Sequence, residues 1–168
     1  MEPIKIIATG GTFEKQYDEI EEKLILRDSN VPKILQKARC KAPVNLKIIK
    51  LIDSLEMDVG MRELILEECR KSKEQKIIII HGTSLMAETS LFLGRNIEDK
   101  TIVLTGAMIP SRFPDSDAEF NLGCAFAFAQ ALPKGVYLAM NGRCFLWHNV
   151  RKNTQEGVFE EINPPRFK

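Results

Sequence analysis

Hydroxyl side chains follow three apolar, β-branched segments of this sequence, at places where they could attack a bound molecule. The four residues are Thr12, Ser54, Thr83 and Ser84. A threonine or serine hydroxyl attacks a carbonyl group when a neighbouring base removes its proton. Lys100 could be that base if its aliphatic stem folds toward the hydroxyls, because burial lowers the pKa of a lysine. The plainer alternatives are a solvated lysine and hydroxyls that only cap turns.

The segments before these hydroxyls have the composition of buried strands. Residues 77–80 are four consecutive isoleucines, as expected for a strand that is covered on both faces. Residues 4–12 begin with β-branched side chains and end in a turn that contains two glycines. We expect core strands at residues 4–12, 46–52, 77–80, 101–107 and 135–140, and a hairpin between residues 143–146 and the residues that follow.

Apolar residues at helical spacing separate these strands. Asn30 and Pro32 mark the start of the first helix. Strands that alternate with helices predict an α/β fold with a parallel sheet, formed by residues 1–168 as a single domain. The carboxyl ends of parallel strands lie on one edge, so the hydroxyls should converge there, whereas Lys100 precedes its strand at the opposite end. We expect helices at residues 30–38, 61–69, 85–93 and 117–132.

Residues 13–28 are polar and rich in charge. They predict a loop over residues 13–23 that a short strand at residues 24–26 closes. A long loop beside a site at a strand end is often a lid. A solvated connector would have the same composition, so both interpretations stay open.

Charge and hydropathy argue against several classes of partner. Lys and Arg number 24 and Asp and Glu number 23, with no basic stripe, so nucleic acid is not an expected partner. No apolar run approaches the roughly 20 residues that cross a bilayer, and residues 1–3 lack the basic region of a signal peptide. The four cysteines form no CxxC pair, which favours reduced thiols and a cytoplasmic protein. We expect neither a metal ion nor a cofactor.

Several motifs resemble the bacterial-type asparaginase/glutaminase family. Thr9-Gly10-Gly11-Thr12 resembles its TGGT signature, and residues 81–89 resemble HGTDTMxET. Residues 100–110 resemble a KPVVxxGAMRP segment, and residues 120–122 and 151–154 are similar to later family positions. The resemblance covers nearly the whole chain but only the N-terminal domain of the family. It implies a flavodoxin-like, three-layer α/β fold and hydrolysis of an amide through a threonine ester.

The resemblance also implies roles for four residues in catalysis. Thr12 matches the first catalytic threonine, which is the expected nucleophile. Thr83 matches the second catalytic threonine, and Lys100 matches the lysine that activates it. Tyr17 matches the tyrosine of the lid.

The substrate-binding positions match the family only in part. Ser54 matches the serine that holds the α-carboxylate of the substrate, and the turns at Gly11 and Gly82 offer backbone N–H groups to an oxyanion. The family has Asp where this chain has Ser84, and Gln where it has Leu55. The sequence also stops before the second domain, which in the family lends an acidic residue to a neighbouring subunit. These three groups hold the α-ammonium of asparagine, and a cation without an acceptor is costly to desolvate.

These departures leave three hypotheses about function. The first is an amidohydrolase for a small, carboxylate-bearing amide that lacks a free α-amine, or whose amine is blocked or lies within a larger molecule. The second is an asparaginase or glutaminase whose amine recognition is rebuilt from lid residues such as Glu14, or from a neighbouring subunit. The third is a non-catalytic ligand-binding or assembly protein, because a fold alone does not determine function.

The helix expected at residues 117–132 is apolar in more directions than a helix with one solvated side requires. It must be covered by its own domain or by another chain, and the absent second domain would leave family interface surface bare. We therefore predict a homo-oligomer, most simply a two-fold dimer. The alternative is that the sheet and residues 159–168 cover the helix within one subunit. The residues on which this prediction depends are Leu122, Gly123, Ala125, Phe126, Ala127, Phe128 and Ala131.

Overall fold

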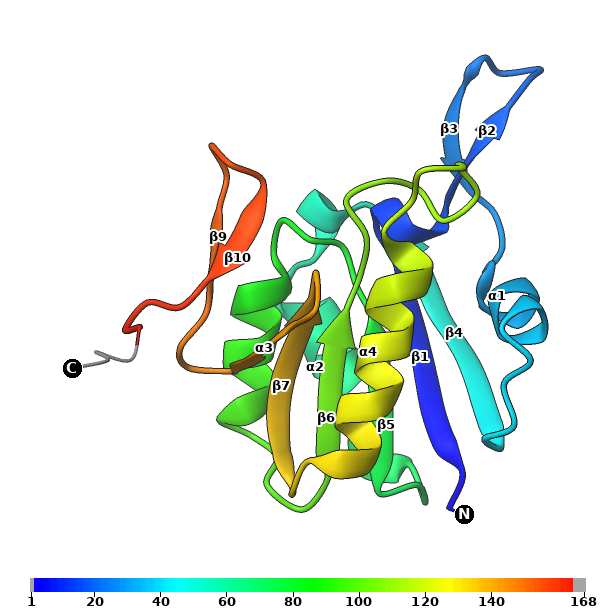
Figure 1. Cartoon of the computed structure of the whole chain (residues 1–168). Helices are drawn as coiled ribbons and strands as arrows, with labels where there is room; N and C mark the ends of the chain where they lie inside the picture. Colours follow the sequence, from blue (N-terminus) through cyan, green and yellow to red (C-terminus); the bar gives the residue numbers. More distant parts are fainter. Residues whose placement is uncertain (1, 165–168) are drawn as a thin grey trace.

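The computed structural model of the protein describes residues 2–164 and has a six-stranded sheet with helices on both faces (Figure 1). Five strands are parallel, and their spatial order corresponds to 2-1-3-4-5, which is the flavodoxin-like order. The sixth strand runs antiparallel at one edge. The predicted α/β fold with a mostly parallel sheet is therefore confirmed. In spatial order the strands are β4 (Val44–Ile52), β1 (Ile4–Gly10), β5 (Lys76–Ile80), β6 (Thr101–Thr105), β7 (Gly135–Met140) and β8 (Arg143–Leu146).

Two helices cover each face of the sheet. Helices α1 (Val31–Lys37) and α4 (Ala118–Ala131) lie on one face, and α2 (Val59–Lys71) and α3 (Met86–Gly94) lie on the other. The isoleucines of β5 alternate between the two cores, and all four are fully buried. A strand that is covered on both faces has no polar side to offer, which explains the unbroken apolar run.

The edge strand β8 differs from the expectation that residues 143–146 pair with the residues after them. It pairs with β7, which precedes it. The turn between the two strands is Asn141-Gly142, and both residues have positive φ, 51° and 79°. An Asn-Gly pair at this φ is the preferred two-residue hairpin connection, because its twist matches that of the strands. The next residues form a separate hairpin of β9 (Arg151–Asn153) and β10 (Val158–Glu160).

The expected lid is also a hairpin. Strands β2 (Lys15–Asp18) and β3 (Lys23–Leu26) pair antiparallel and project beyond the sheet (Figure 1). The carboxylate of Asp18 accepts hydrogen bonds from the backbone N–H groups of Ile20 and Glu21, at 3.0 and 3.1 Å. These bonds fix the connecting turn and hold the pKa of Asp18 below its usual value. The sequence predicts the closing strand at residues 24–26, but it does not predict the partner strand β2.

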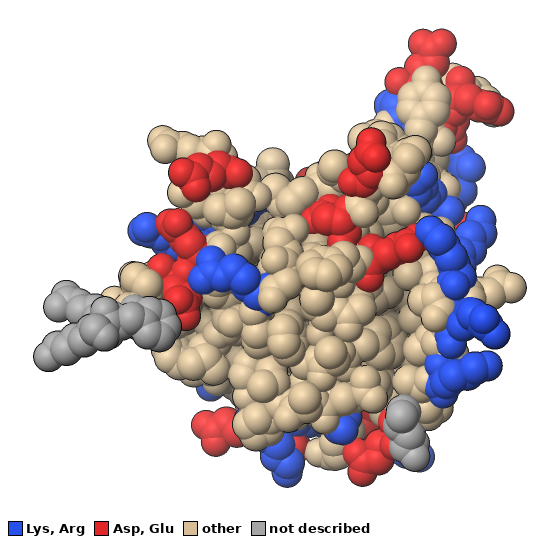
Figure 2. Space-filling view, in the orientation of Figure 1, with Lys and Arg blue, Asp and Glu red and all other residues tan. Residues whose placement is uncertain are grey.

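Helix α4 is half covered. Leu122, Ala125 and Ala129 are buried against the sheet, whereas Phe120 on another side of the helix is 62% exposed. The surface over α4 and β7 carries few charged side chains (Figure 2). Phe159 packs in the core on the α2 and α3 side, so the tail as far as residue 164 leaves α4 uncovered; residues 165–168 lie outside the described part. Among the described helices, none has the length and apolar character needed to span a membrane.

Candidate active site

Three loops meet at the carboxyl edge of the sheet. Gly10 and Gly11 have φ of 102° and 71°, a backbone conformation that side chains other than glycine resist. A Cβ atom on Gly11 would collide with the backbone of Gly82, and a Cβ atom on Gly82 would collide with Ser54. Only glycine allows so close an approach. The turns after β1, β4 and β5 are therefore in contact, and they bring the loops of Thr12, Ser54 and Thr83 together as the parallel sheet predicted.

A lysine and a threonine form the closest catalytic pair at this edge. The Nζ atom of Lys152 donates a hydrogen bond to Oγ1 of Thr83 at 2.8 Å. Lys152 lies on β9, and Thr83 follows β5 and is almost fully buried. Partial burial of Lys152 lowers the pKa of its amine, which increases the fraction of the neutral base. This pair has the parts that a hydroxyl-based hydrolase needs for proton transfer.

Lys100 lies elsewhere, and the expectation that it activates Thr83 is wrong. It precedes β6 at the amino edge, and its Nζ atom donates to the carbonyl oxygens of Ser72 and Glu74, at 2.8 and 3.1 Å. Strand β6 has five residues, so the carboxyl edge is roughly 16 Å away, beyond the reach of a four-carbon stem. The amine of Lys100 therefore joins backbone segments on the far side of the sheet.

Two serines are linked beside the threonines. Oγ of Ser54 donates to Oγ of Ser84 at 3.0 Å. The neighbouring Asp53 forms an ion pair with Lys15 at 2.5 Å, and this contact is the main cause that holds the pKa of Asp53 below its usual value. The pair ties the base of the β2–β3 hairpin to the loop that carries Ser54. Leu55 is 77% exposed.

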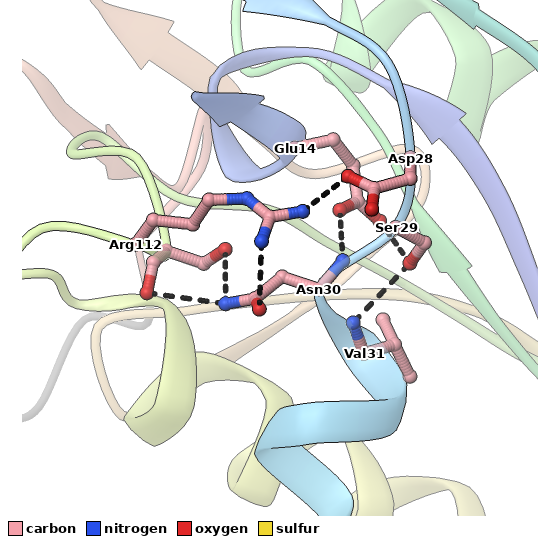
Figure 3. A network of polar contacts seen from close by, with 7 residues as sticks. Glu14, Asp28, Ser29, Asn30, Val31 and Arg112 are labelled. Carbon is pink, nitrogen blue, oxygen red and sulfur yellow. Dashed lines mark hydrogen bonds and ion pairs between the residues drawn. The ribbon is translucent and has the colours of Figure 1, made fainter. Parts of the chain in front are cut away.

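Glu14 holds the loop of Thr12 (Figure 3). Its carboxylate accepts from Oγ of Ser29 at 2.7 Å and from the backbone N–H of Asn30 at 2.9 Å. Glu14 is fully buried, and the burial raises its pKa despite these hydrogen bonds. It shares the short 3-10 turn η1 (Thr12–Glu14) with Thr12, so the network fixes the backbone next to that hydroxyl. Because both carboxylate oxygens are occupied, Glu14 is not the amine acceptor that the second hypothesis required.

The same network continues to the loop after β6. The side-chain amide of Asn30 donates to Oγ of Ser111 at 3.1 Å, and Arg112 pairs with Asp28. The backbone N–H of Ser111 also donates to the carbonyl oxygen of Phe13 at 3.1 Å. Thr12 is thus held from two loops.

Two further expected residues take different places. Tyr17 lies on β2 and is 59% exposed, so the structure does not bring it to the threonines. The backbone N–H of Gly11 donates to the carbonyl oxygen of Ile52 at 2.8 Å, so this donor is occupied. The backbone N–H groups of Thr12, Gly82 and Thr83 have no hydrogen-bond partner within residues 2–164. These three are the available oxyanion donors.

A pocket of about 330 Å³ adjoins the Lys152–Thr83 pair. Ser84 and Lys152 line its inner end. One wall is a face of α3 that carries Ala87, Glu88 and Leu91. The other wall is mainly apolar and comes from the C-terminal part of the chain: Trp147, Val150 and Ile162.

Sequence reasoning missed Lys152 although the signal was present. The resemblance places residues 151–154 at later family positions, but it gives the role of the lysine to the KPVV-like segment. Two observations point to Lys152: it follows the last core strand, and Lys100 precedes its own strand. A lysine at the start of a parallel strand cannot reach groups at the end of its neighbours.

These features describe a class: an α/β protein with hydroxyls and a partly desolvated amine at the carboxyl edge of a parallel sheet. Residues 3–166 match the family description "Asparaginase, N-terminal", and the chain belongs to this family.

Individual relatives agree with this assignment. An L-asparaginase of Thermococcus kodakarensis is 32% identical over 95% of this chain and 51% of its own length. One of the proteins that make up the glutamyl-tRNA(Gln) amidotransferase of Methanococcus maripaludis is 31% identical over 96% of this chain and 44% of its own length. The structure of the thermostable L-asparaginase from Thermococcus kodakarensis superposes with a TM-score of 0.85 at 29% identity, over 97% of this chain and 52% of that one. The chain therefore spans about half the length of these relatives.

Proposed function

We propose that this protein is an amidohydrolase that cleaves a carboxylate-bearing amide through a threonine ester. The observation that carries the proposal is the 2.8 Å contact between Nζ of Lys152 and Oγ1 of Thr83. In this mechanism Oγ1 of Thr12 attacks the amide carbon, and its proton passes through Thr83 to the neutral amine of Lys152. The lysine then protonates the departing ammonia, and water hydrolyses the ester. Backbone N–H groups of Thr12 and Thr83 stabilise the oxyanion.

The preferred substrate lacks a free α-ammonium group. Ser84 offers a hydroxyl in place of a charged acceptor and already receives a hydrogen bond from Ser54. Leu55 is apolar and exposed, and Glu14 is occupied by Ser29 and Asn30. The pocket beside Lys152 leaves room for a substrate that is larger than asparagine, with an apolar group along α3. Ser54 remains the residue proposed to hold the carboxylate.

Succinamate, which is asparagine without its amine, should be hydrolysed with a kcat/KM about 10-fold or more above that of asparagine, because an unpaired ammonium is costly to bind. Ammonia release from both substrates measures this ratio. The double variant Ser84→Asp and Leu55→Gln should move the preference toward asparagine, because it restores the family residues at both positions. A native enzyme that strongly prefers asparagine would contradict this part of the proposal.

Hydrolysis of free asparagine is the second candidate, and one observation favours it. The carboxylate of Glu88 lines the pocket with Ser84, and its side chain makes no ion pair within the described residues. It could accept an ammonium group. If it does, Glu88→Gln should raise KM for asparagine and leave KM for succinamate unchanged, which separates the two candidates in one comparison.

We also propose that residues 1–168 form one domain that acts as a homo-oligomer, most simply a dimer, in the cytoplasm. Support for association comes from the exposed Phe120 and the weakly charged surface over α4. The four cysteines are free thiols, in keeping with a reducing compartment.

Sedimentation equilibrium at micromolar concentration should give about twice the chain mass of 19.1 kDa. The variant Phe120→Glu should shift the equilibrium toward the monomer, because it places a charge on the apolar surface. A wild-type protein that sediments only at 19.1 kDa would contradict the oligomer.

A further inference from the structure

His81 is a buried histidine with one occupied and one unpaired nitrogen. It follows β5 directly, and its side chain is fully buried. Its Nδ1 atom lies 2.7 Å from the carbonyl oxygen of Gly82. A carbonyl oxygen only accepts hydrogen bonds, so Nδ1 must carry the proton and Nε2 must be the bare nitrogen. Nε2 has no partner among the atoms of residues 2–164.

The charge state of His81 agrees with this assignment. Desolvation is the main cause that lowers its pKa to about 4, and the charge of Arg62 acts in the same direction. The ring is therefore neutral at physiological pH, with a single proton to place. Its one donor serves the carbonyl group of Gly82.

This hydrogen bond sets the direction of the next peptide group. A trans peptide is planar, and its C=O and N–H bonds point in opposite directions. The carbonyl of Gly82 faces the buried ring of His81, so the N–H of Thr83 faces away from it. That N–H has no hydrogen-bond partner within the described residues, and it belongs to the threonine that Lys152 contacts.

Nothing else within residues 2–164 holds this peptide in the same way. Gly82 has the conformational freedom of glycine, which its tight contact with Ser54 requires. An apolar ring in place of His81 would spare the unpaired Nε2, but it would leave the carbonyl of Gly82 buried without a donor. The peptide could then rotate to satisfy its oxygen elsewhere, and the N–H of Thr83 would turn with it.

We propose that His81 is a positioning residue whose Nδ1–H group holds the Gly82–Thr83 peptide so that the N–H of Thr83 faces the developing oxyanion. The proposal rests on the amidohydrolase function proposed above. It adds a residue that never touches the substrate and acts through one backbone peptide.

Three variants test the position of the donor. The side-chain nitrogen of Asn reaches about where Nδ1 lies, that of Gln reaches further toward the place of Nε2, and Leu has no donor. His81→Leu and His81→Gln should lower kcat by about 10²–10³-fold with little change in KM, which is the effect of losing one oxyanion donor. His81→Asn should retain most of the wild-type kcat. Thermal unfolding of all three variants separates loss of folded protein from loss of turnover.

A spectroscopic measurement on the wild-type full chain is independent of activity. Long-range ¹H–¹⁵N correlation spectra at pH 7 should show His81 protonated at Nδ1 and bare at Nε2. The amide signal of Thr83 should stay in place in His81→Asn and shift in His81→Gln. Protonation at Nε2, or equal loss of kcat in the Asn and Leu variants, would overturn the proposal. If the wild type hydrolyses no amide, the proposed function fails, and the two NMR results alone decide whether His81 sets the Thr83 peptide.

Discussion

Replacement of Lys152 by methionine should lower kcat for amide hydrolysis by about 10²–10⁴-fold, which is the usual contribution of a positioned acid–base group. Methionine keeps much of the apolar stem but cannot take or return a proton. The amine of Lys152 contacts Oγ1 of Thr83, so the loss should fall on the chemical step more than on KM. Steady-state ammonia release on the best substrate measures both constants.

Lys100→Met is the matched control for this experiment. It removes the amine that binds the carbonyl oxygens of Ser72 and Glu74, so it should lower the free energy of unfolding. It should leave kcat of the folded fraction close to wild type, because Lys100 lies at the far edge of the sheet. Equal loss of kcat in both variants would remove the distinction between the two lysines.

The pH dependence gives a second test of the role of Lys152. Its folded-state pKa is lowered by burial, and the neutral amine is the form that accepts a proton. The rate should therefore rise with pH through this lowered pKa and reach its plateau below pH 10.5, the ordinary value for lysine. This limb should be absent from the residual activity of Lys152→Met. The same lowered pKa means that folding is less favourable at pH values below it, where the buried amine must be charged.

Replacement of Thr12 by alanine should reduce amide hydrolysis by about 10³-fold or more, because the ester can no longer form. Thr12→Ser should retain part of the activity, since it keeps a hydroxyl at the same backbone position. The backbone there is held by Glu14, Ser29 and Asn30, so neither variant should disturb the loop. Initial rates of ammonia release from both variants measure the effect.

Ser54→Ala is the control for binding. Its hydroxyl is proposed to hold the carboxylate in the ground state and the transition state alike, so its loss should mainly raise KM. Wild-type rates in Thr12→Ala would refute the nucleophile, and a loss confined to kcat in Ser54→Ala would refute the binding role.

The sequence contained enough information for the core but not for its edges. The isoleucine run at residues 77–80 admits only a strand buried on both faces, and the strand–helix alternation then requires parallel pairing. The convergence of the loops at Thr12, Ser54 and Thr83 followed from that topology. The hairpin of β7 and β8 was predictable in principle from Asn141-Gly142, because that pair is a strong short-range turn signal.

The polar partners could not be predicted in the same way. Glu14 lies in a segment that is rich in charge, where a solvated side chain is the ordinary expectation. It is instead buried by hydrogen bonds from Ser29 and Asn30, which are distant in sequence and meet it only in the fold. The error on Lys100 has a related cause: motif similarity assigns a residue type, whereas the edge of the sheet on which it lies depends on strand direction. His81 shows the same limit, since its role depends on which carbonyl its ring meets.

The most direct test of the proposed mechanism is to locate the covalent intermediate. The protein is mixed with succinamate, quenched in acid within milliseconds to seconds, digested and mapped by mass spectrometry. We predict a succinyl ester on the peptide that contains Thr12, present in the wild type, enriched when Lys152→Met slows hydrolysis of the ester, and absent from Thr12→Ala. Turnover with the ester on Thr83, or turnover that Thr12→Ala leaves intact, would contradict the mechanism.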